Sequence, residues 1–113
     1  MKIGLKLWSI NENYIQEARR LYTGNVCDYI ELYVVPGSYE KYSNFWKGLD
    51  IPFIIHAPHF SHGVNPAKQE AHEKSFEKAA EAMRFADVLN ARHIIFHPGI
   101  DGDKDNTVDF FKR

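Results

Sequence analysis

The chain has 113 residues, of which 44% are hydrophobic and 14% aromatic, and this composition excludes a disordered chain and indicates one small globular domain. Its formal net charge of −1 argues against a module that binds nucleic acid through charge alone. No apolar stretch approaches the roughly 20 residues of a membrane-spanning helix, and the single Cys27 excludes an internal disulfide, so we expect a cytoplasmic protein without a membrane partner.

The first half of the chain predicts two strand–helix units. Apolar residues alternate with others over residues 3–8, which indicates a strand, and a helical pattern follows over residues 11–24. β-branched and aromatic residues indicate a second strand over residues 29–35. A helix capped by Ser38 comes next, and its predicted buried stripe is Tyr42, Phe45, Trp46 and Leu49.

The second half repeats this pattern. A short apolar run over residues 52–56 predicts a third strand, and residues 93–97 predict a fourth. Between them, Asn65 and a following proline begin the longest predicted helix, whose inner face is expected to carry Phe76, Ala79, Met83 and Ala86. The amphipathic segment 106–113 starts another helix.

Strand–helix alternation predicts an α/β fold with a parallel sheet, either doubly wound or a (β/α)₈ barrel of TIM type. No glycine-rich phosphate loop follows the first strand, which argues against a dinucleotide-binding sheet. Strand parity favours the barrel, because one face of the strands is uniformly apolar and the other is mixed. The mixed face holds Lys6, Trp8, Glu31, Tyr33, Ile54, His56, His93, Ile95 and His97.

Four strand–helix units, with the last helix only begun, make half of a barrel that typically has about 250 residues. Half of a closed sheet leaves two parallel edges without partners. We therefore expect residues 1–113 to form a single partial domain, the N-terminal half of a larger barrel. The alternative is a non-catalytic half-barrel that self-associates through its exposed sheet edges.

A histidine ends each of the last two predicted strands, and a proline follows closely. His56 stands in Ile-Ile-His-Ala-Pro, and His97 stands in Ile-Ile-Phe-His-Pro-Gly. The carboxyl ends of parallel strands meet at the mouth of a barrel, and imidazole is a common zinc ligand, so this pattern predicts a divalent metal site. The alternative is a pair of histidines that only cap strand ends through hydrogen bonds.

These two motifs and the long charged helix between them resemble the endonuclease IV family (AP endonuclease family 2), a branch of the xylose isomerase-like TIM barrels. The resemblance covers residues 51–99. It implies a metal centre, usually zinc, with His56 and His97 as ligands, and hydrolysis of the phosphodiester beside an abasic site in DNA. It also places the remaining ligands on later strands, so we expect this chain alone to be inactive.

A second segment resembles another branch of the same superfamily. Residues 28–32, Asp-Tyr-Ile-Glu-Leu, are similar to the second strand of the sugar isomerases and epimerases. That resemblance implies a small sugar or sugar phosphate as substrate and one divalent ion, manganese or magnesium. Both alternatives, the phosphodiester hydrolase and the sugar isomerase, stay open on the sequence.

Three further residues are candidates for the substrate pocket. Trp8 ends the first strand on the mixed face and either lines the pocket or packs as a core or rim aromatic. Glu31 either pairs with Lys6 on the adjacent strand or contacts substrate. His59 either approaches the metal site or lies on the surface of its loop, and we expect the surface position.

The other histidines are expected to lie outside the site. His62 and His72 are predicted to be solvated. His93 opens the fourth strand at the opposite end of the barrel, where we expect a structural hydrogen bond.

Overall fold

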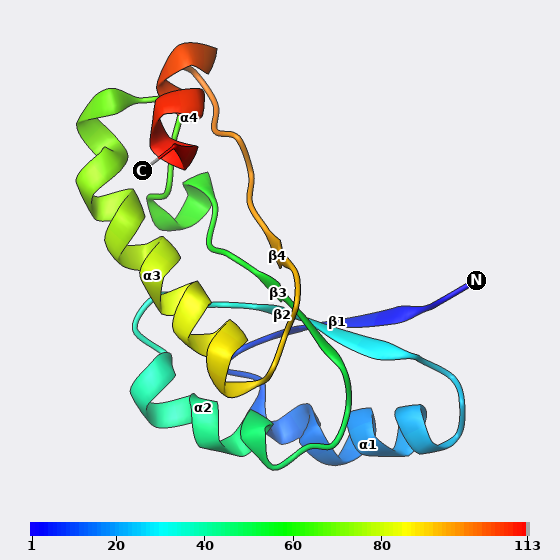
Figure 1. Ribbon diagram of the computed structural model, residues 1–113. Helices are drawn as coiled ribbons and strands as arrows, with labels where there is room; N and C mark the ends of the chain where they lie inside the picture. The colour runs from blue at the N-terminus through cyan, green and yellow to red at the C-terminus, as the bar shows by residue number, and fades with distance from the viewer. Residues whose placement is uncertain (113) are drawn as a thin grey trace.

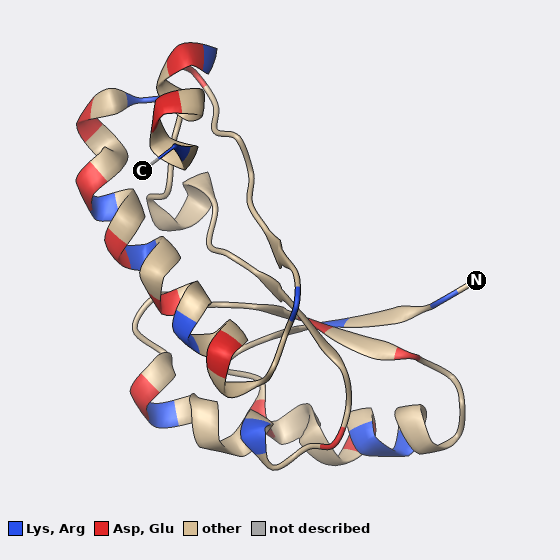
Figure 2. Cartoon of the chain, viewed as in Figure 1, with Lys and Arg blue, Asp and Glu red and all other residues tan. Residues whose placement is uncertain are grey.

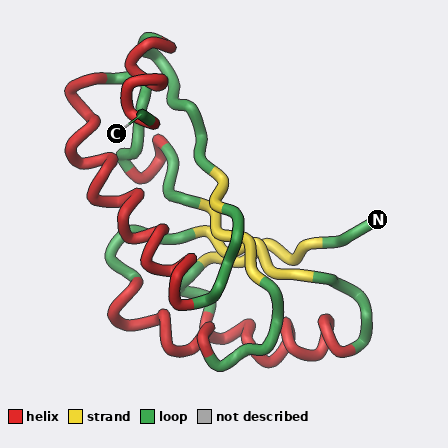
Figure 3. The backbone as a smooth tube through the Cα atoms, in the orientation of Figure 1, coloured by secondary structure: helices red, strands yellow, loops and turns green. Residues whose placement is uncertain are grey.

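The protein is described by a computed structural model of residues 1–112, in which one sheet holds four parallel strands in the order β1-β2-β3-β4. A helix connects each strand to the next, and Figure 1 and Figure 3 show α1, α2 and α3 on one side of this sheet. The predicted alternation is therefore confirmed, and its last residue, Arg113, lies outside the described residues. The elements in chain order are β1 (Gly4–Trp8), α1 (Ile15–Thr23), β2 (Tyr29–Tyr33), α2 (Tyr39–Lys47), β3 (Phe53–His56), α3 (His72–Val88), β4 (Ile94–Ile95) and α4 (Lys104–Phe111), with short 3₁₀ turns at η1 (Glu12–Tyr14), η2 (Phe60–His62) and η3 (Gln69–Ala71).

The strand register aligns the apolar residues on the side of the sheet that faces the helices. Leu7 lies opposite Leu32, and Leu32 lies opposite Ile55. Successive side chains of a strand point to opposite faces, so the mixed residues between them point away from the helices. The predicted apolar face is confirmed by its buried members, Leu7, Ile30, Leu32, Val34, Phe53 and Ile55.

Each of the three covering helices contributes side chains to the core under this face. Trp46 of α2 is fully buried, and its indole N–H donates to the Ser9 carbonyl oxygen at 2.8 Å. Phe85 of α3 is also fully buried, while the small residues Ala18 and Ala82 let α1 and α3 approach the sheet closely. Burial of these apolar groups is the main source of stability of the sheet–helix layer.

Two residues predicted for the core lie in solvent instead. The side chains of Phe45 and Met83 are 46% and 56% exposed. Each stands next to a fully buried residue, Trp46 or Ala82, and neighbouring residues on a helix point about 100° apart. The buried residues of α3 are His72, Ser75, Ala79, Ala82, Phe85 and Ala86. The predicted inner face is therefore confirmed at Ala79 and Ala86 and wrong at Met83.

Helix α3 begins at His72, seven residues after the predicted start at Asn65. The preceding segment folds over the first turn of the helix. The Asn65 N–H donates to the Ser75 hydroxyl at 3.0 Å, and a His72 ring N–H donates to the Pro66 carbonyl at 2.7 Å. His72 is consequently buried, and the expectation that it would be solvated was wrong.

Strand β4 is also shorter than the predicted segment 93–97, since it pairs with β3 only through Ile94 and Ile95. The chain then returns across the start of α3 in α4. Phe110 of α4 stacks on Phe76 with ring centroids 4.3 Å apart. The segment after β4 is thus anchored by α4 and by loop contacts rather than by a long strand.

Lysine, arginine, aspartate and glutamate side chains lie mainly on the helices (Figure 2). The segment 53–67, which includes β3 and the loop after it, contains none of these four residue types. None of the helices in the described part of the chain is both long and apolar enough to cross a membrane. Polar chemistry in the segment 53–67 therefore depends on histidine, serine and asparagine.

Replacing Leu32 by alanine is expected to lower the free energy of unfolding by about 3 kcal/mol, because it leaves a cavity in the central strand. Leu32 is fully buried, whereas Met83 is 56% exposed. The matched control Met83→Ala is expected to change stability by less than about 0.5 kcal/mol. Urea unfolding followed by circular dichroism measures both, and equal losses would contradict the assigned core.

Candidate metal centre

One row of side chains crosses the sheet at the carboxyl ends of the strands. The register places Trp8 opposite Tyr33, Tyr33 opposite His56, and His56 opposite Ile95. All four point to the face that the helices leave uncovered. His97 follows two residues after Ile95, so the loop after β4 brings it to the same end as His56.

The two strand-end histidines meet at this end of the sheet. The Nε2 atoms of His56 and His97 lie 3.1 Å apart. His56 is 4% exposed, and its Nδ1 lies 2.8 Å from the Ala57 carbonyl oxygen. A carbonyl only accepts, so Nδ1 carries the proton and donates it, which leaves the His56 Nε2 unprotonated. In the metal-free chain this nitrogen accepts a hydrogen bond from the His97 Nε2–H.

The surroundings of His56 favour its neutral form. Burial is the largest effect and lowers its pKa below the ordinary value, and the nearby Lys6 and His97 lower it further. The hydrogen bond to Ala57 and the charge of Glu31 oppose this shift. A neutral imidazole with a free Nε2 lone pair is the form that binds a metal ion.

The separation of the two nitrogens fits a shared ion. Ligand nitrogens at 2.0–2.1 Å from a tetrahedral zinc ion are about 3.3 Å apart, close to the observed 3.1 Å. An ion there would replace the hydrogen bond between the two rings. Within residues 1–112, no group of three or more histidine, cysteine or acidic side chains is placed to hold an ion. The residues fit two ligands of a metal centre and not a complete set.

His59 lies beside this pair, as in the alternative that it approaches the site, and it is less exposed than the surface position expected for it. Its half-buried ring stacks on His97 with centroids 4.9 Å apart. Burial lowers its pKa most, followed by the neighbouring His97, His56 and His62. Its Nδ1 accepts a hydrogen bond from the Ser61 N–H at 3.2 Å. This contact uses the Nδ1 lone pair and leaves the proton of the neutral ring on Nε2.

Tyr33 and His62 complete the cluster, and neither was predicted from the sequence to lie in the site. Tyr33 is 1% exposed, and its hydroxyl oxygen lies 2.6 Å from the His62 Nδ1. His62 is half-buried and packs on the Tyr33 ring, so it is less exposed than the solvated position expected for it. Strand parity placed Tyr33 on the same face as His56, and this was the one feature of the sequence that could have predicted its position in the site. The turn η2, which brings His62 back to Tyr33, left no pattern in the sequence.

The other predicted pocket residues lie on the same open face. Trp8 is 44% exposed and packs on Tyr33, with ring centroids 5.1 Å apart. Lys6 and Glu31 form an ion pair at 3.2 Å. They precede Trp8 and Tyr33 by two residues and are the next pair on the same face of the sheet. Pairing with Lys6, one of the two alternatives for Glu31, is therefore present. Trp8 lies at the rim of the mouth as a partly exposed aromatic residue.

Asn65 ties the loop after β3 to the loop after β4. Its side-chain oxygen accepts from the Ile100 N–H at 3.1 Å, and its amide donates to the Ile100 carbonyl at 2.9 Å. Gly99 lies against this contact with φ of 107°, and a Cβ there would come within 2.4 Å of the Asn65 Oδ1. This pairing of loops holds His97 beside His56.

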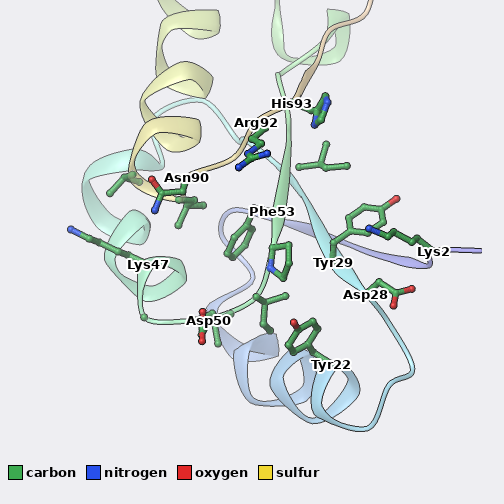
Figure 4. A pocket seen from close by; sticks show the side chains of 17 residues that line it. Lys2, Tyr22, Asp28, Tyr29, Lys47, Asp50, Phe53, Asn90, Arg92 and His93 are labelled. Carbon is green, nitrogen blue, oxygen red and sulfur yellow. The ribbon is translucent and has the colours of Figure 1, made fainter.

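A separate open cavity of about 1020 Å³ lies at the opposite, amino-terminal end of the strands. Figure 4 shows Lys2, Tyr29, Phe53, Arg92 and His93 around it. His93 is at the end of the sheet where it was expected, but its side chain is exposed instead of held by a structural hydrogen bond to another described residue. The cavity is remote from the histidine cluster.

Comparison with known structures agrees with this architecture. The fold matches that of endonuclease IV from Thermus thermophilus with a TM-score of 0.66 and 18% sequence identity, over 99% of this chain and 45% of that chain. The chain has the fold of half a TIM barrel. No protein-family model and no curated protein matches the sequence. The half-barrel therefore has an established fold, and at this identity the likeness does not establish its family.

Acidification of the metal-free half-barrel is expected to lower its free energy of unfolding. The pKa values of His56 and His59 lie below the ordinary 6.5, so the unfolded chain takes up protons there before the folded chain does. This contribution to stability is complete above pH 6.5 and is lost as the pH falls from 6.5 toward the lower folded-state values. Urea unfolding in a chelator, between about pH 8 and about pH 5, measures the slope.

His56→Gln is expected to flatten this pH profile, because glutamine does not titrate. His93→Gln, at the other end of the sheet, serves as the matched control and is expected to keep the full slope. An unchanged slope in His56→Gln would contradict the assigned surroundings of His56.

Replacing Asn65 by alanine removes both hydrogen bonds to Ile100 and releases the loop that carries His97. We expect the affinity for zinc to fall about tenfold, as for other residues that orient metal ligands. Stability is expected to fall by about 1–3 kcal/mol. Isothermal titration calorimetry measures the affinity, with the exposed Asn44→Ala as control, and an unchanged affinity would argue that the loop pairing does not position His97.

Proposed function

We propose that this half-barrel supplies two imidazole ligands to the divalent metal centre of a hydrolase that cleaves phosphodiesters at abasic sites in DNA. Zinc is the proposed metal, since nitrogen ligands suit it better than magnesium, which prefers oxygen. The observation that carries the proposal is the 3.1 Å separation of the His56 and His97 Nε2 atoms. The hydrogen bond from His56 to Ala57 supports it, because that bond leaves one of these nitrogens free to bind metal.

Position and charge support the same proposal. Both histidines lie at the carboxyl ends of the strands, where the active sites of TIM barrels are found. Lys6 and the imidazoles of the cluster are the positive or protonatable groups around His59, which suits an anionic substrate. The solved structure with this fold is named as an endonuclease. We also propose a cytoplasmic location, in keeping with the free, buried thiol of Cys27.

A zinc ion bound here would polarise a phosphoryl oxygen and lower the pKa of a bound water. The residues of the half-barrel orient the ligands and shield them from water. The Ala57 carbonyl fixes the plane of the His56 ring, and the stacked His59 ring limits rotation of His97. Ala57 and Tyr33 are almost fully buried and exclude water behind His56. Such rigid support of metal ligands is what a catalytic metal site requires.

The Lys6–Glu31 pair supports a second candidate, a sugar or sugar-phosphate isomerase or epimerase with one manganese or magnesium ion. The pair lies on the open face one row below the cluster, where a carboxylate and an ammonium group would reach a small substrate. However, the two groups form an ion pair with each other at 3.2 Å and are not free to bind a substrate. The hydrolase is therefore the first candidate.

Zinc titration of the 113-residue chain tests the metal site. The chain is expected to bind one zinc ion, and His56→Gln and His97→Gln are each expected to weaken binding at least tenfold, because each removes one of two ligands. His93→Gln is the matched control and is expected to bind as the unchanged chain does. Binding that survives in both ligand variants would overturn the proposal.

Binding of two probes by the zinc-loaded chain separates the two candidate functions. We expect a duplex with one tetrahydrofuran abasic analogue to bind at least about fivefold more tightly than the same duplex without it, and a free ketose not to bind. Binding of the ketose alone would favour the isomerase. Cleavage of the abasic duplex by this chain is expected to be absent, because two ligands hold a catalytic ion weakly, and measurable cleavage would contradict that expectation.

A further inference from the structure

The loop after β3 carries two histidines that the proposed metal site does not use, His59 and His62. His59 precedes the turn η2 and His62 ends it, and Gly63 closes the turn with a φ of 82°, a conformation that favours glycine. The Lys78 ammonium group donates to the His62 carbonyl at 2.6 Å and anchors the end of the turn on α3. The two rings are held 6.2 Å apart, centroid to centroid.

The hydrogen bonds of Tyr33 favour one position for the proton of His62. The Tyr33 hydroxyl oxygen accepts from the His59 N–H at 3.1 Å, and its own proton is free to point at the His62 Nδ1, 2.6 Å away. A neutral His62 that accepts there carries its proton on Nε2. A protonated His62 carries one on Nε2 as well. With the Tyr33 hydroxyl as donor to Nδ1, the Nε2 of His62 is a hydrogen-bond donor in both forms.

His59 has the same arrangement through a different partner. The Ser61 N–H can only donate, so the His59 Nδ1 accepts and the neutral ring carries its proton on Nε2. His56 is the opposite case, since its Nδ1–H donates to Ala57 and its Nε2 is free. The strand histidine thus offers a lone pair for a metal, and the two loop histidines offer N–H groups.

Both N–H groups are open to a ligand. No hydrogen bond joins the Nε2 atom of His59 or His62 to another described residue, and over residues 1–112 no buried side-chain nitrogen or oxygen lacks a partner. The two Nε2 atoms therefore reach solvent at the mouth of the sheet. His59 stacks on His97, so a ligand at these donors would lie beside the metal position.

The charges around the loop favour binding of an anion over a cation. Segment 53–67 contains no carboxylate, and the nearby carboxylate of Glu31 is paired with Lys6. Lys78 adds a positive charge at the end of the turn. Two N–H donors match the oxygens of a phosphodiester anion, which only accept hydrogen bonds.

We propose that the His59 and His62 Nε2–H groups form a phosphoryl-binding pair beside the metal position, with Tyr33 as the residue that fixes the His62 proton on Nε2. This inference rests on the proposed function and names the groups that hold the substrate phosphodiester. His59 and His62 bind substrate oxygen, and Tyr33 is a positioning residue.

Imidazole nitrogen NMR of the labelled, metal-free chain tests the positions of the protons. Long-range proton–nitrogen correlations are expected to show His62 with its proton on Nε2, and Tyr33→Phe is expected to give a mixture of both neutral forms. A proton on Nδ1 in the unchanged chain, or an unchanged pattern in a folded Tyr33→Phe variant, would overturn the role of Tyr33. A Tyr33→Phe variant that does not fold leaves the first comparison decisive.

Binding of dimethyl phosphate, a phosphodiester anion, to the zinc-loaded chain tests the donor pair. His62→Leu is expected to weaken binding about tenfold, because hydrogen bonds to charged groups are strong. His62→Gln is expected to stay within about threefold, since its amide N–H can replace Nε2–H. Equal affinity in His62→Leu and the unchanged chain would sink the inference.

Zinc affinity separates this test from that of the metal site. His62→Leu is expected to bind zinc as the unchanged chain does, because His62 is not a ligand. An unchanged chain that fails to bind zinc would overturn the proposed function itself. Normal zinc binding with unaltered dimethyl phosphate binding in His62→Leu would overturn only the phosphoryl-binding pair.

Discussion

The in-register pairing of parallel strands at their carboxyl ends is the constraint on which the site depends. Side chains alternate along a strand, so a slip of one residue would turn His56 toward the helices. The register is held from the other face, where Leu32 and Ile55 are fully buried. Burial of these apolar side chains stabilises the register by roughly 25 cal/mol per Å². The same register directs the His56 imidazole and the Tyr33 ring toward the open face. Stability and site geometry are set by the same strands.

The histidines of the cluster differ in which ring nitrogen carries the proton, and this determines whether Nε2 offers a lone pair or an N–H group. The backbone carbonyl of Ala57 fixes the proton of His56 on Nδ1, and in our proposal the Tyr33 hydroxyl has the opposite effect on His62. No charged side chain of the same segment is needed for either assignment, because segment 53–67 has none. Neutral hydrogen-bond partners also keep the desolvation penalty of the half-buried mouth small, since buried charges cost far more than buried amides.

Much of the fold could be predicted from period and parity. The four strands, the apolar face and the meeting of His56 with His97 all follow from local patterns combined with the rule that parallel strands end together. The roles of His59 and His62 could not be predicted, because they depend on the turn η2 and on a hydroxyl from another strand. Apolar content also misled at Met83, which is exposed although the neighbouring Ala82 and the nearby Phe85 are fully buried.

The short β4 gives the half-barrel an uneven architecture. His56 extends from a strand with partners on both sides, whereas His97 follows a strand of two residues and relies on the Asn65 contact between loops. The free energy needed to open contacts between loops is lower than that needed to open the hydrogen bonds between central strands. Substitutions around Asn65 and Gly99 can therefore reshape one half of the site without disturbing the sheet. A half-barrel built in this way can change the position of one imidazole through its loops while the other stays fixed by the sheet.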